Sequence, residues 1–182
     1  MSGQARVDPG GKAERKCNLG CGPDTREGWV NVDQVPLPGM TVRADLAHIP
    51  HPFKDSVFDF LEARHLLEHL PDVVLAVEEF HRVCKPNARV YIEVPYWNSD
   101  DAHADPTHRH FFTEHSFDYF TEGRKWSGFN YYSRARFHID RIEYKFNESP
   151  YLRWIPRRLG RKLAKYIGNI VVAVGFHLRV VK

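Results

Sequence analysis

A helix between two apolar runs is the feature that most constrains how this chain can fold. The runs at 57–63 and 88–95 have the length of buried strands. Over residues 72–85, between the two runs, apolar side chains recur at helical spacing, with Asp72 as the expected N-cap and Pro86 as the stop. Because a strand, a helix and a second strand form a right-handed crossover between parallel strands, we predict an α/β domain with a mostly parallel sheet.

Other apolar runs predict the remaining strands, and two further segments predict helices. A short helix is expected over 113–120, capped by Thr113. A basic helix opened by Pro156 is expected over 156–167. The last two predicted strands flank this basic helix, so they form either a third parallel crossover or an edge hairpin. The other predicted strands are 16–19, 29–33, 41–46, 136–146 and 170–181.

The length of 182 residues corresponds to about one domain. We expect residues 1–14 to form a flexible tail and residues 15–182 to form a single domain. No stretch approaches the roughly 20 apolar residues of a transmembrane helix, and the first residues lack the pattern of a secretion signal, which favours a cytoplasmic location. Cys17, Cys21 and Cys84 are too few for a disulfide framework and are expected as reduced core thiols.

A glycine turn follows the first predicted strand. Residues 20–22 place two glycines where open parallel sheets bind ligands, while Asp33 ends the second strand and Asp45 the third. Carboxylates at these ends can accept hydrogen bonds from ribose hydroxyls and from an adenine amino group. Only residues 23–28 separate the turn from the second strand, which predicts a shortened first crossover. A nucleoside without phosphates is the expected ligand, because no helix N-terminus is available to hold a pyrophosphate.

Several ordered motifs resemble those of one enzyme family. Residues 18–22 (NLGCG) are similar to its cofactor loop, and residues 28–33 (GWVNVD) to its second strand with the ribose-binding acid. Residues 65–70 (HLLEHL) and 82–87 (RVCKPN) are similar to its L-E-H and R-V-L-K-P-G signatures. On these motifs the chain resembles class I S-adenosylmethionine-dependent methyltransferases over about residues 16–120, especially the small bacterial Methyltransf_11-like group.

The resemblance implies a Rossmann-like sheet flanked by helices, with S-adenosylmethionine as the cofactor. It assigns Asp45 and Leu46 to the adenine side of the cofactor, and the backbone amides of residues 20–22 to the methionine side. His65 lies closer in sequence to the cofactor end than the other histidines, so we expect it to line the methionine part. Asn18 stands where the family often has an acid. The predicted cofactor-binding residues are Asn18, Gly20, Cys21, Gly22, Asp33, Asp45, Leu46 and His65.

The segment 96–112 departs from any regular period and is rich in His, Asp, Asn and Pro. Loops of this length are often functional, and this one is expected to act as a lid on the acceptor side. Methyl transfer is an in-line displacement, in which a hydroxyl or amine acceptor gains from a base that removes its proton. Histidine titrates near neutrality, so His108 is the first candidate for this base and His110 the second.

The same histidines raise the alternative of a metal site. His65 and His69 lie four residues apart, and His103 and Asp105 follow in the loop. Neutral imidazoles and a carboxylate can bind zinc or iron. The L-E-H motif, however, matches a family signature that needs no metal. We therefore predict no metal site and expect these side chains to cap and hydrogen-bond the loop.

Basic residues gather in the last part of the chain, where residues 134–182 carry 12 Lys/Arg against 3 Asp/Glu. In the predicted basic helix, the apolar residues recur on one face; these are Leu159, Leu163, Tyr166 and Ile167. One interpretation is a solvated basic face whose apolar side packs on the sheet. The other is a surface for anionic lipid, nucleic acid or a phosphorylated substrate.

Together these features predict an S-adenosylmethionine-dependent methyltransferase that acts on oxygen or nitrogen of a small-molecule or saccharide acceptor. RNA methylation guided by the basic helix is one alternative, although an Asn-Pro-Pro-Tyr-type base-flipping signature is lacking, which disfavours nucleic acid. A non-catalytic binding module that docks through the basic helix is the other. Peripheral membrane contact is compatible with an enzyme that modifies a lipid-linked saccharide.

Overall fold

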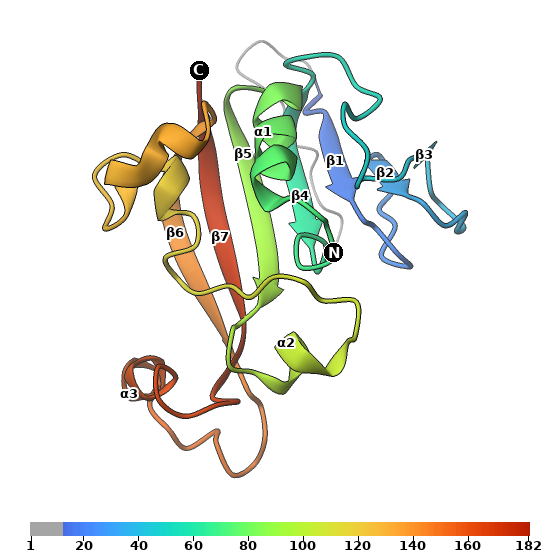
Figure 1. Ribbon diagram of the computed structural model, residues 1–182. Coiled ribbons are helices and arrows are strands. Elements are labelled where there is room, and N and C mark those ends of the chain that lie inside the picture. The colour runs from blue at the N-terminus through green and yellow to red at the C-terminus, as the bar shows by residue number, and fades with distance from the viewer. Residues whose placement is uncertain (1–12) are drawn as a thin grey trace.

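The computed structural model describes residues 13–182, which form one sheet of seven strands. The strands are β1 (Lys16–Leu19), β2 (Val30–Asp33), β3 (Val42–Arg43), β4 (Phe58–Arg64), β5 (Cys84–Pro95), β6 (Arg136–Phe146) and β7 (Val171–Val181). Their order in the sheet is β3-β2-β1-β4-β5-β7-β6 (Figure 1). The first five are parallel, and β7 runs antiparallel between β5 and β6. This arrangement confirms the predicted Rossmann-like, mostly parallel α/β fold.

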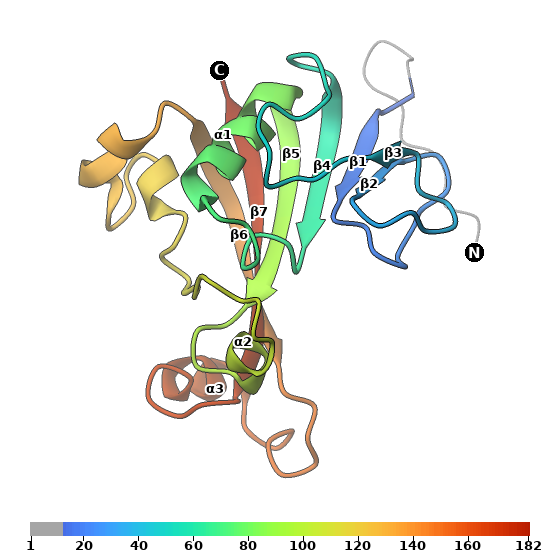
Figure 2. The same cartoon turned by 45° about the vertical axis from the view of Figure 1, so that its right-hand side comes forward.

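The helices occupy two different places around the sheet. They are α1 (Val73–Val83), α2 (Asp100–Ala104) and α3 (Arg157–Leu163), with 3-10 helices η1 (Asp118–Phe120) and η2 (Ser127–Tyr132). Helix α1 lies across one face of β4 and β5, whereas α2 and α3 lie beyond the carboxyl ends of the parallel strands (Figures 1 and 2). The second group therefore borders the edge at which the sequence places the ligand.

The β4-α1-β5 crossover forms as its sequence pattern predicts. The Asp72 carboxylate caps α1 by accepting a hydrogen bond from the Leu75 amide at 2.9 Å. The helix ends at Val83, two residues before its predicted end, because the chain extends at Cys84 and pairs there with Phe58 of β4. The buried face of α1 joins the main core between helix and sheet.

The connections before β4 contain no helix in the described chain. Residues 20–29 pass from β1 to β2 through turns, which confirms the shortened first crossover. Strand β3 has 2 residues, so its predicted extent of 41–46 is wrong. The reason lies at Asp45, whose carboxylate accepts a hydrogen bond from the Ala47 amide at 3.0 Å and so bends the chain into a turn.

Strands β6 and β7 form a long antiparallel hairpin, which decides between the two alternatives left open by the sequence. Arg136 pairs with Val181 at one end of the hairpin, and Phe146 pairs with Val171 at the other. Helix α3 therefore lies in the connection within a hairpin and not in a parallel crossover. Because β7 also pairs with β5, this connection emerges next to the carboxyl end of β5.

Two predictions for the segment after β5 are corrected by the structure. The predicted loop 96–112 contains α2, which forms because the Ser99 hydroxyl accepts a hydrogen bond from the Ala102 amide. The predicted helix 113–120 is a series of turns that ends in η1. Thr113 still accepts a hydrogen bond from the His115 amide, at 3.2 Å, but the turns that follow are 3-10 in character.

Helix α3 is shorter than the predicted 156–167 and is turned differently. Gly160 is buried, and a Cβ atom there would lie 2.9 Å from the Phe146 ring, so the glycine lets α3 approach β6 closely. With this side buried, Leu159 is 48% exposed and Tyr166 is 87% exposed. The expected packing of these two side chains on the sheet is therefore wrong.

Residues 1–12 of the predicted flexible tail lie outside the described residues. Glu14, the last residue of that tail, forms an ion pair with Arg89 at 2.6 Å and so joins the folded domain. The three cysteines are free and buried, in line with their prediction as core thiols. Over residues 13–182, no helix is long and apolar enough to cross a membrane.

Arg82 at the end of α1 anchors the segment that leads into β4. Its guanidinium donates hydrogen bonds to the Glu79 carboxylate at 2.8 Å and to the Phe53 carbonyl at 2.8 Å. It also donates to Asp55 at 2.6 Å. Glu79 is 6% exposed, so its charge depends on this partner.

We expect Arg82→Met to lower the free energy of unfolding by about 2 kcal/mol, because it leaves the buried Glu79 carboxylate without its cation. Urea denaturation followed by circular dichroism measures the change. Arg158→Met, on the exposed side of α3, is the matched control and should be nearly neutral. Equal stability of the two variants would show that Arg82 contributes nothing.

Candidate functional site

A hollow of about 500 Å³ opens at the carboxyl ends of the first four strands. We call it the rim hollow. It contains five of the eight predicted cofactor residues, which meet there because parallel strands end at one edge of the sheet. These five are Gly20, Asp33, Asp45, Leu46 and His65. Seven further residues line the hollow but were not predicted to bind the cofactor: Gln34, Ala44, Ala47, Leu66, His69, Leu70 and Thr107.

Gly20 forms the turn at the end of β1. Its φ of +64° lies in the left-handed region that favours glycine. A Cβ atom at this position would lie 3.0 Å from Leu66 Cδ1, so a side chain here would press on the residue that lines the opposite wall. Glycine therefore serves both the turn and the open space of the hollow.

Asp33, at the end of β2, holds the glycine turn in place. One carboxylate oxygen accepts a hydrogen bond from the Gly22 amide at 2.9 Å, and the other accepts from the Val35 amide at 2.9 Å. Each oxygen keeps a further lone pair for a ligand. The side chain is thus fixed in position and can accept hydrogen bonds from vicinal hydroxyls.

Asp45 lies on the far wall of the hollow, in the turn after β3. The hydrogen bond from the Ala47 amide lowers the pKa of Asp45, and the His48 ring lies 2.8 Å from its second oxygen. Asp45 is therefore ionised at neutral pH. Leu46 follows as a buried side chain, 5% exposed, that supplies an apolar surface beside this carboxylate.

The other three predicted cofactor residues do not line the hollow and instead shape its loop. The Asn18 side chain donates to the Asp24 carbonyl at 2.7 Å. The Cys21 amide donates to the Val32 carbonyl at 3.0 Å, and burial raises the pKa of the Cys21 thiol. Because the Cys21 and Gly22 amides already donate hydrogen bonds within the protein, the structure does not support the expectation that they hold a cofactor carboxylate.

The connection after β1, residues 20–29, has no crossover helix, and an ion pair holds this connection against the sheet. Both terminal nitrogens of Arg26 lie 2.7 Å from the Glu62 carboxylate of β4, and the guanidinium covers the Trp29 ring at 4.8 Å. Glu62 is 3% exposed, whereas the Arg26 side chain is 26% exposed, so the buried carboxylate is held by two matched hydrogen bonds from a partly exposed guanidinium. It fastens the loop from β1 to β2 onto the sheet.

A cluster of Glu68, His69 and His108 borders the rim hollow. One ligand atom from each of the three side chains lies within 4.8 Å of the other two. The two rings are 4.6 Å apart, with His69 following β4 and His108 belonging to the segment after β5. His108, the first predicted base, packs against His69, which lines the hollow, but His108 itself is not part of the lining. His110 Nε2 lies 2.9 Å from the Leu70 carbonyl and is not part of the lining either.

His65 connects this cluster to the sheet. Its Nδ1 lies 3.3 Å from Glu68 Oε1, and its Nε2 lies 3.7 Å from Glu93 Oε1. The contact with Glu68 raises the pKa of His65. The L-E-H motif singled out Glu68 and His69 in the sequence. The contact of Glu68 with His108 depends on how the segment after β5 folds back.

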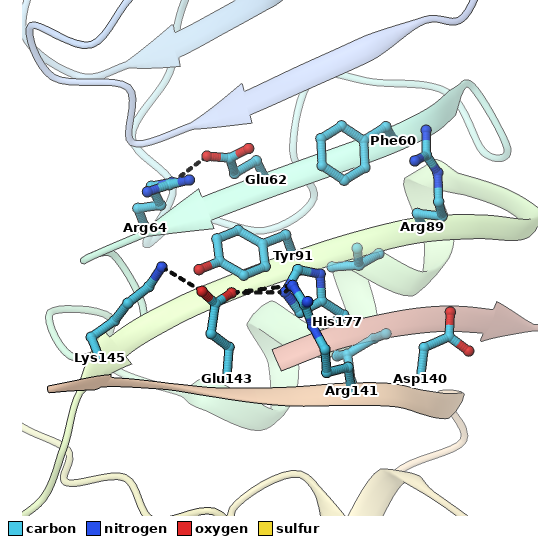
Figure 3. Close-up of a pocket in the computed structure, with 12 residues that line it drawn as sticks. Phe60, Glu62, Arg64, Arg89, Tyr91, Asp140, Arg141, Glu143, Lys145 and His177 are labelled. Carbon is cyan, nitrogen blue, oxygen red and sulfur yellow. Dashed lines mark hydrogen bonds and ion pairs between the residues drawn. The ribbon is translucent and has the colours of Figure 1, made fainter. Parts of the chain in front are cut away.

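A second hollow, of about 480 Å³, lies on the sheet face formed by β4, β5, β7 and β6 (Figure 3). Its charged side chains have charged partners, several of them within the hollow itself. Glu143 accepts from Lys145 at 2.9 Å and lies 3.1 Å from His177, while Arg64 pairs with Glu62 (Figure 3). It lies away from the glycine turn and the strand ends, so the rim hollow is the better site for a nucleoside.

Comparison with known families identifies the domain. Residues 17–92 match the model of a methyltransferase domain family, Methyltransf_11. The match covers less than half of the chain and is consistent with a class I methyltransferase. This methyltransferase uses S-adenosylmethionine as its cofactor, and the alternative of a non-catalytic module is set aside. No curated protein matches the sequence.

Solved structures support the fold of this methyltransferase. An S-adenosylmethionine-dependent methyltransferase from Archaeoglobus fulgidus has a TM-score of 0.65 at 16% identity, over 91% of this chain and 86% of that one. One from Mesorhizobium loti has a TM-score of 0.56 at 14% identity, over 91% and 90%. One from Methanosarcina mazei has a TM-score of 0.54 at 15% identity, over 92% and 92%. At these identities the likeness concerns the fold.

Proposed function

We propose that this methyltransferase binds its cofactor in the rim hollow and transfers the methyl group to a hydroxyl or amine of a small-molecule or saccharide acceptor. The observation that carries the proposal is the meeting of Gly20, Asp33 and the histidine cluster at one hollow. Its volume of about 500 Å³ lies in the range of small-ligand sites. The residues present therefore fit a nucleoside cofactor.

Each wall of the hollow has a distinct task in this proposal. Asp33 accepts hydrogen bonds from the ribose hydroxyls, because its oxygens are fixed and have free lone pairs. Asp45 and Leu46 hold the adenine side by polar and apolar contact. His65 stands on the methionine side, and the acceptor approaches from the segment that carries Thr107 and His108.

In this proposal His108 takes up the proton that the acceptor loses. S-adenosylmethionine supplies an electrophilic methyl group: an acceptor lone pair bonds to the methyl carbon as the methyl–sulfur bond breaks and its electron pair stays on sulfur. His108 Nδ1 donates to the Ala102 carbonyl at 3.1 Å, so its Nε2 carries a lone pair. A base with a lone pair facing the acceptor can take the proton that the new bond releases.

Cofactor binding tests the first part of the proposal. We expect Asp33→Ala to weaken binding of S-adenosylmethionine by at least about tenfold, because it removes the ribose contact and releases the Gly22 amide. Isothermal titration calorimetry with the cofactor and its demethylated product measures this. Asp140→Ala, a carboxylate of β6 paired with Arg179, is the control and should bind normally. Unchanged affinity in Asp33→Ala would place the cofactor elsewhere.

Transfer of label tests the second part. Incubation of cell extracts with methyl-labelled cofactor and the enzyme should mark a small molecule or saccharide, detected by mass spectrometry. We expect His108→Ala to lower this transfer by about 100-fold or more while cofactor binding persists. Label found only in RNA or protein would contradict the proposed acceptor class.

The basic–aromatic lobe, residues 149–169, bears on where the acceptor is found. It holds six Lys/Arg and no acidic residue. Tyr151 is 90% exposed and Trp154 is 77% exposed, and Leu159 and Ile167 are also exposed. Aromatic and aliphatic side chains beside many cations are typical of surfaces that lie on anionic bilayers, whereas aliphatic side chains offer nothing to RNA bases.

The lobe is tied to the acceptor side of the site. The Asn98 side chain donates to the Ala164 carbonyl at 2.8 Å, and the Asp100 amide donates to Asn169 at 2.6 Å. The start of α2 is thus joined by hydrogen bonds to the segment at the end of α3. We infer that the lobe rests on an anionic membrane surface and brings the hollow close to a lipid-linked saccharide acceptor.

Vesicle binding tests this inference. The protein should co-sediment with phosphatidylcholine vesicles only when these contain phosphatidylserine. Reversal of charge in Arg157→Glu/Arg158→Glu should weaken binding by about tenfold or more, since each cation near the surface contributes about 1 kcal/mol. Trp154→Ala should also weaken it, while Arg134→Glu outside the lobe is the matched control. Salt-sensitive binding to RNA without binding to vesicles would contradict the inference.

A further inference from the structure

Glu68 is a buried carboxylate with no hydrogen-bond partner. It is 0% exposed, and within the described part of the chain neither of its oxygens accepts a hydrogen bond. The closest cation is His65 Nδ1, 3.3 Å from Oε1. Because an ionised carboxylate taken out of water costs several kcal/mol unless it is compensated, this side chain calls for a further partner.

His69 presents a free nitrogen in the same cluster. The Thr107 hydroxyl donates to Asp105 Oδ1 at 2.7 Å, so it has only lone pairs left for His69 Nδ1, 2.8 Å away. His69 therefore carries its proton on Nδ1 and donates it to Thr107. The Nε2 atom of the neutral ring keeps a lone pair.

His108 is held in the same tautomer by another element. Its Nδ1 lies 3.1 Å from the Ala102 carbonyl, which can only accept, so Nδ1 carries the proton. The cluster thus contains one carboxylate and two imidazoles, each with a lone pair on Nε2. Metal-binding histidines are held by such partners on their other ring nitrogen.

We propose that Glu68, His69 and His108 bind one divalent transition-metal ion. The donor set of two neutral imidazoles and one carboxylate is the kind that binds Zn²⁺ and related ions in sites that keep open positions. One ligand atom of each residue already lies within 4.8 Å of the other two. The ion adds positive charge beside the buried Glu68 carboxylate, whose closest partner is otherwise His65.

The place of the cluster gives the ion a role, and this step rests on the proposed function. His69 and Thr107 line the rim hollow, so an open position of the ion faces the acceptor side. A divalent ion there takes the oxygen of an acceptor hydroxyl and lowers the pKa of that hydroxyl, so that its proton is lost to water. In the metal-bound protein His108 is therefore a ligand, and the base role proposed above belongs to the metal-free protein.

Metal titration of the chelator-treated full-length protein tests the site directly. We expect one equivalent of Co²⁺ to bind, with visible absorption bands of a nitrogen- and oxygen-ligated ion, and Zn²⁺ to displace it. Glu68→Gln and His108→Ala should each weaken Co²⁺ binding by about 100-fold, and Thr107→Val by about 10- to 100-fold. His103→Ala, on α2 of the same segment, is the matched control and should bind as the wild type does.

Thermal melting shows whether a variant that fails to bind metal is still folded. Glu68→Gln should melt at or above the temperature of the metal-free wild type, since it removes a buried charge whose oxygens accept no hydrogen bond from residues 13–182, and Zn²⁺ should raise the melting temperature of the wild type only. Absence of stoichiometric Co²⁺ binding, or equal loss in His103→Ala and His108→Ala, would overturn the metal site. Failure of the proposed function is distinguished by calorimetry with S-adenosylmethionine on metal-free protein, which does not depend on the ion.

Discussion

The parallel pairing of β1 with β2 and β4 is the constraint on which the site depends. Leu19 lies opposite Val32 on one side and opposite Ala63 on the other, so three strands end at the same level. Backbone pairing alone therefore brings the glycine turn, Asp33 and the L-E-H segment to one edge. The hydrogen bond from the Gly22 amide to Asp33 then joins the first two of these into one rigid wall.

Short connections shape the rest of this methyltransferase. Since no helix follows β1, the bidentate pair of Arg26 with Glu62 fastens the loop to the sheet instead. The sheet face bordered by this pair carries a network of paired charges around Glu143 rather than an apolar helix contact (Figure 3). Polar side chains on that face are tolerated because each finds an opposite charge or a hydrogen-bond partner.

The proposed metal ion, acceptor and membrane contact all concern the segments beyond the carboxyl ends of the strands. The segment after β5 carries His108 toward Glu68, and its hydrogen bonds to the basic–aromatic lobe fix the lobe beside it. In these proposals the ion lies in the cluster, the acceptor hydroxyl at the hollow beside it, and the bilayer under the lobe. This order suits an enzyme that modifies the exposed end of a membrane-linked molecule.

The sequence by itself determined the features that depend on local periodicity and turn chemistry. These include α1 with its Asp72 cap, the strands of the sheet and the shortened first crossover, as well as the place of Asp33 beside Gly20. Tertiary structure decided the rest, because those features depend on which surfaces meet. Gly160 turned α3 so that Leu159 is exposed, the amides of the glycine turn were taken up by β2, and the fold-back after β5 set His108 against Glu68. Contacts between residues 40 positions apart leave no periodic signal in a sequence, so only the packed chain shows them.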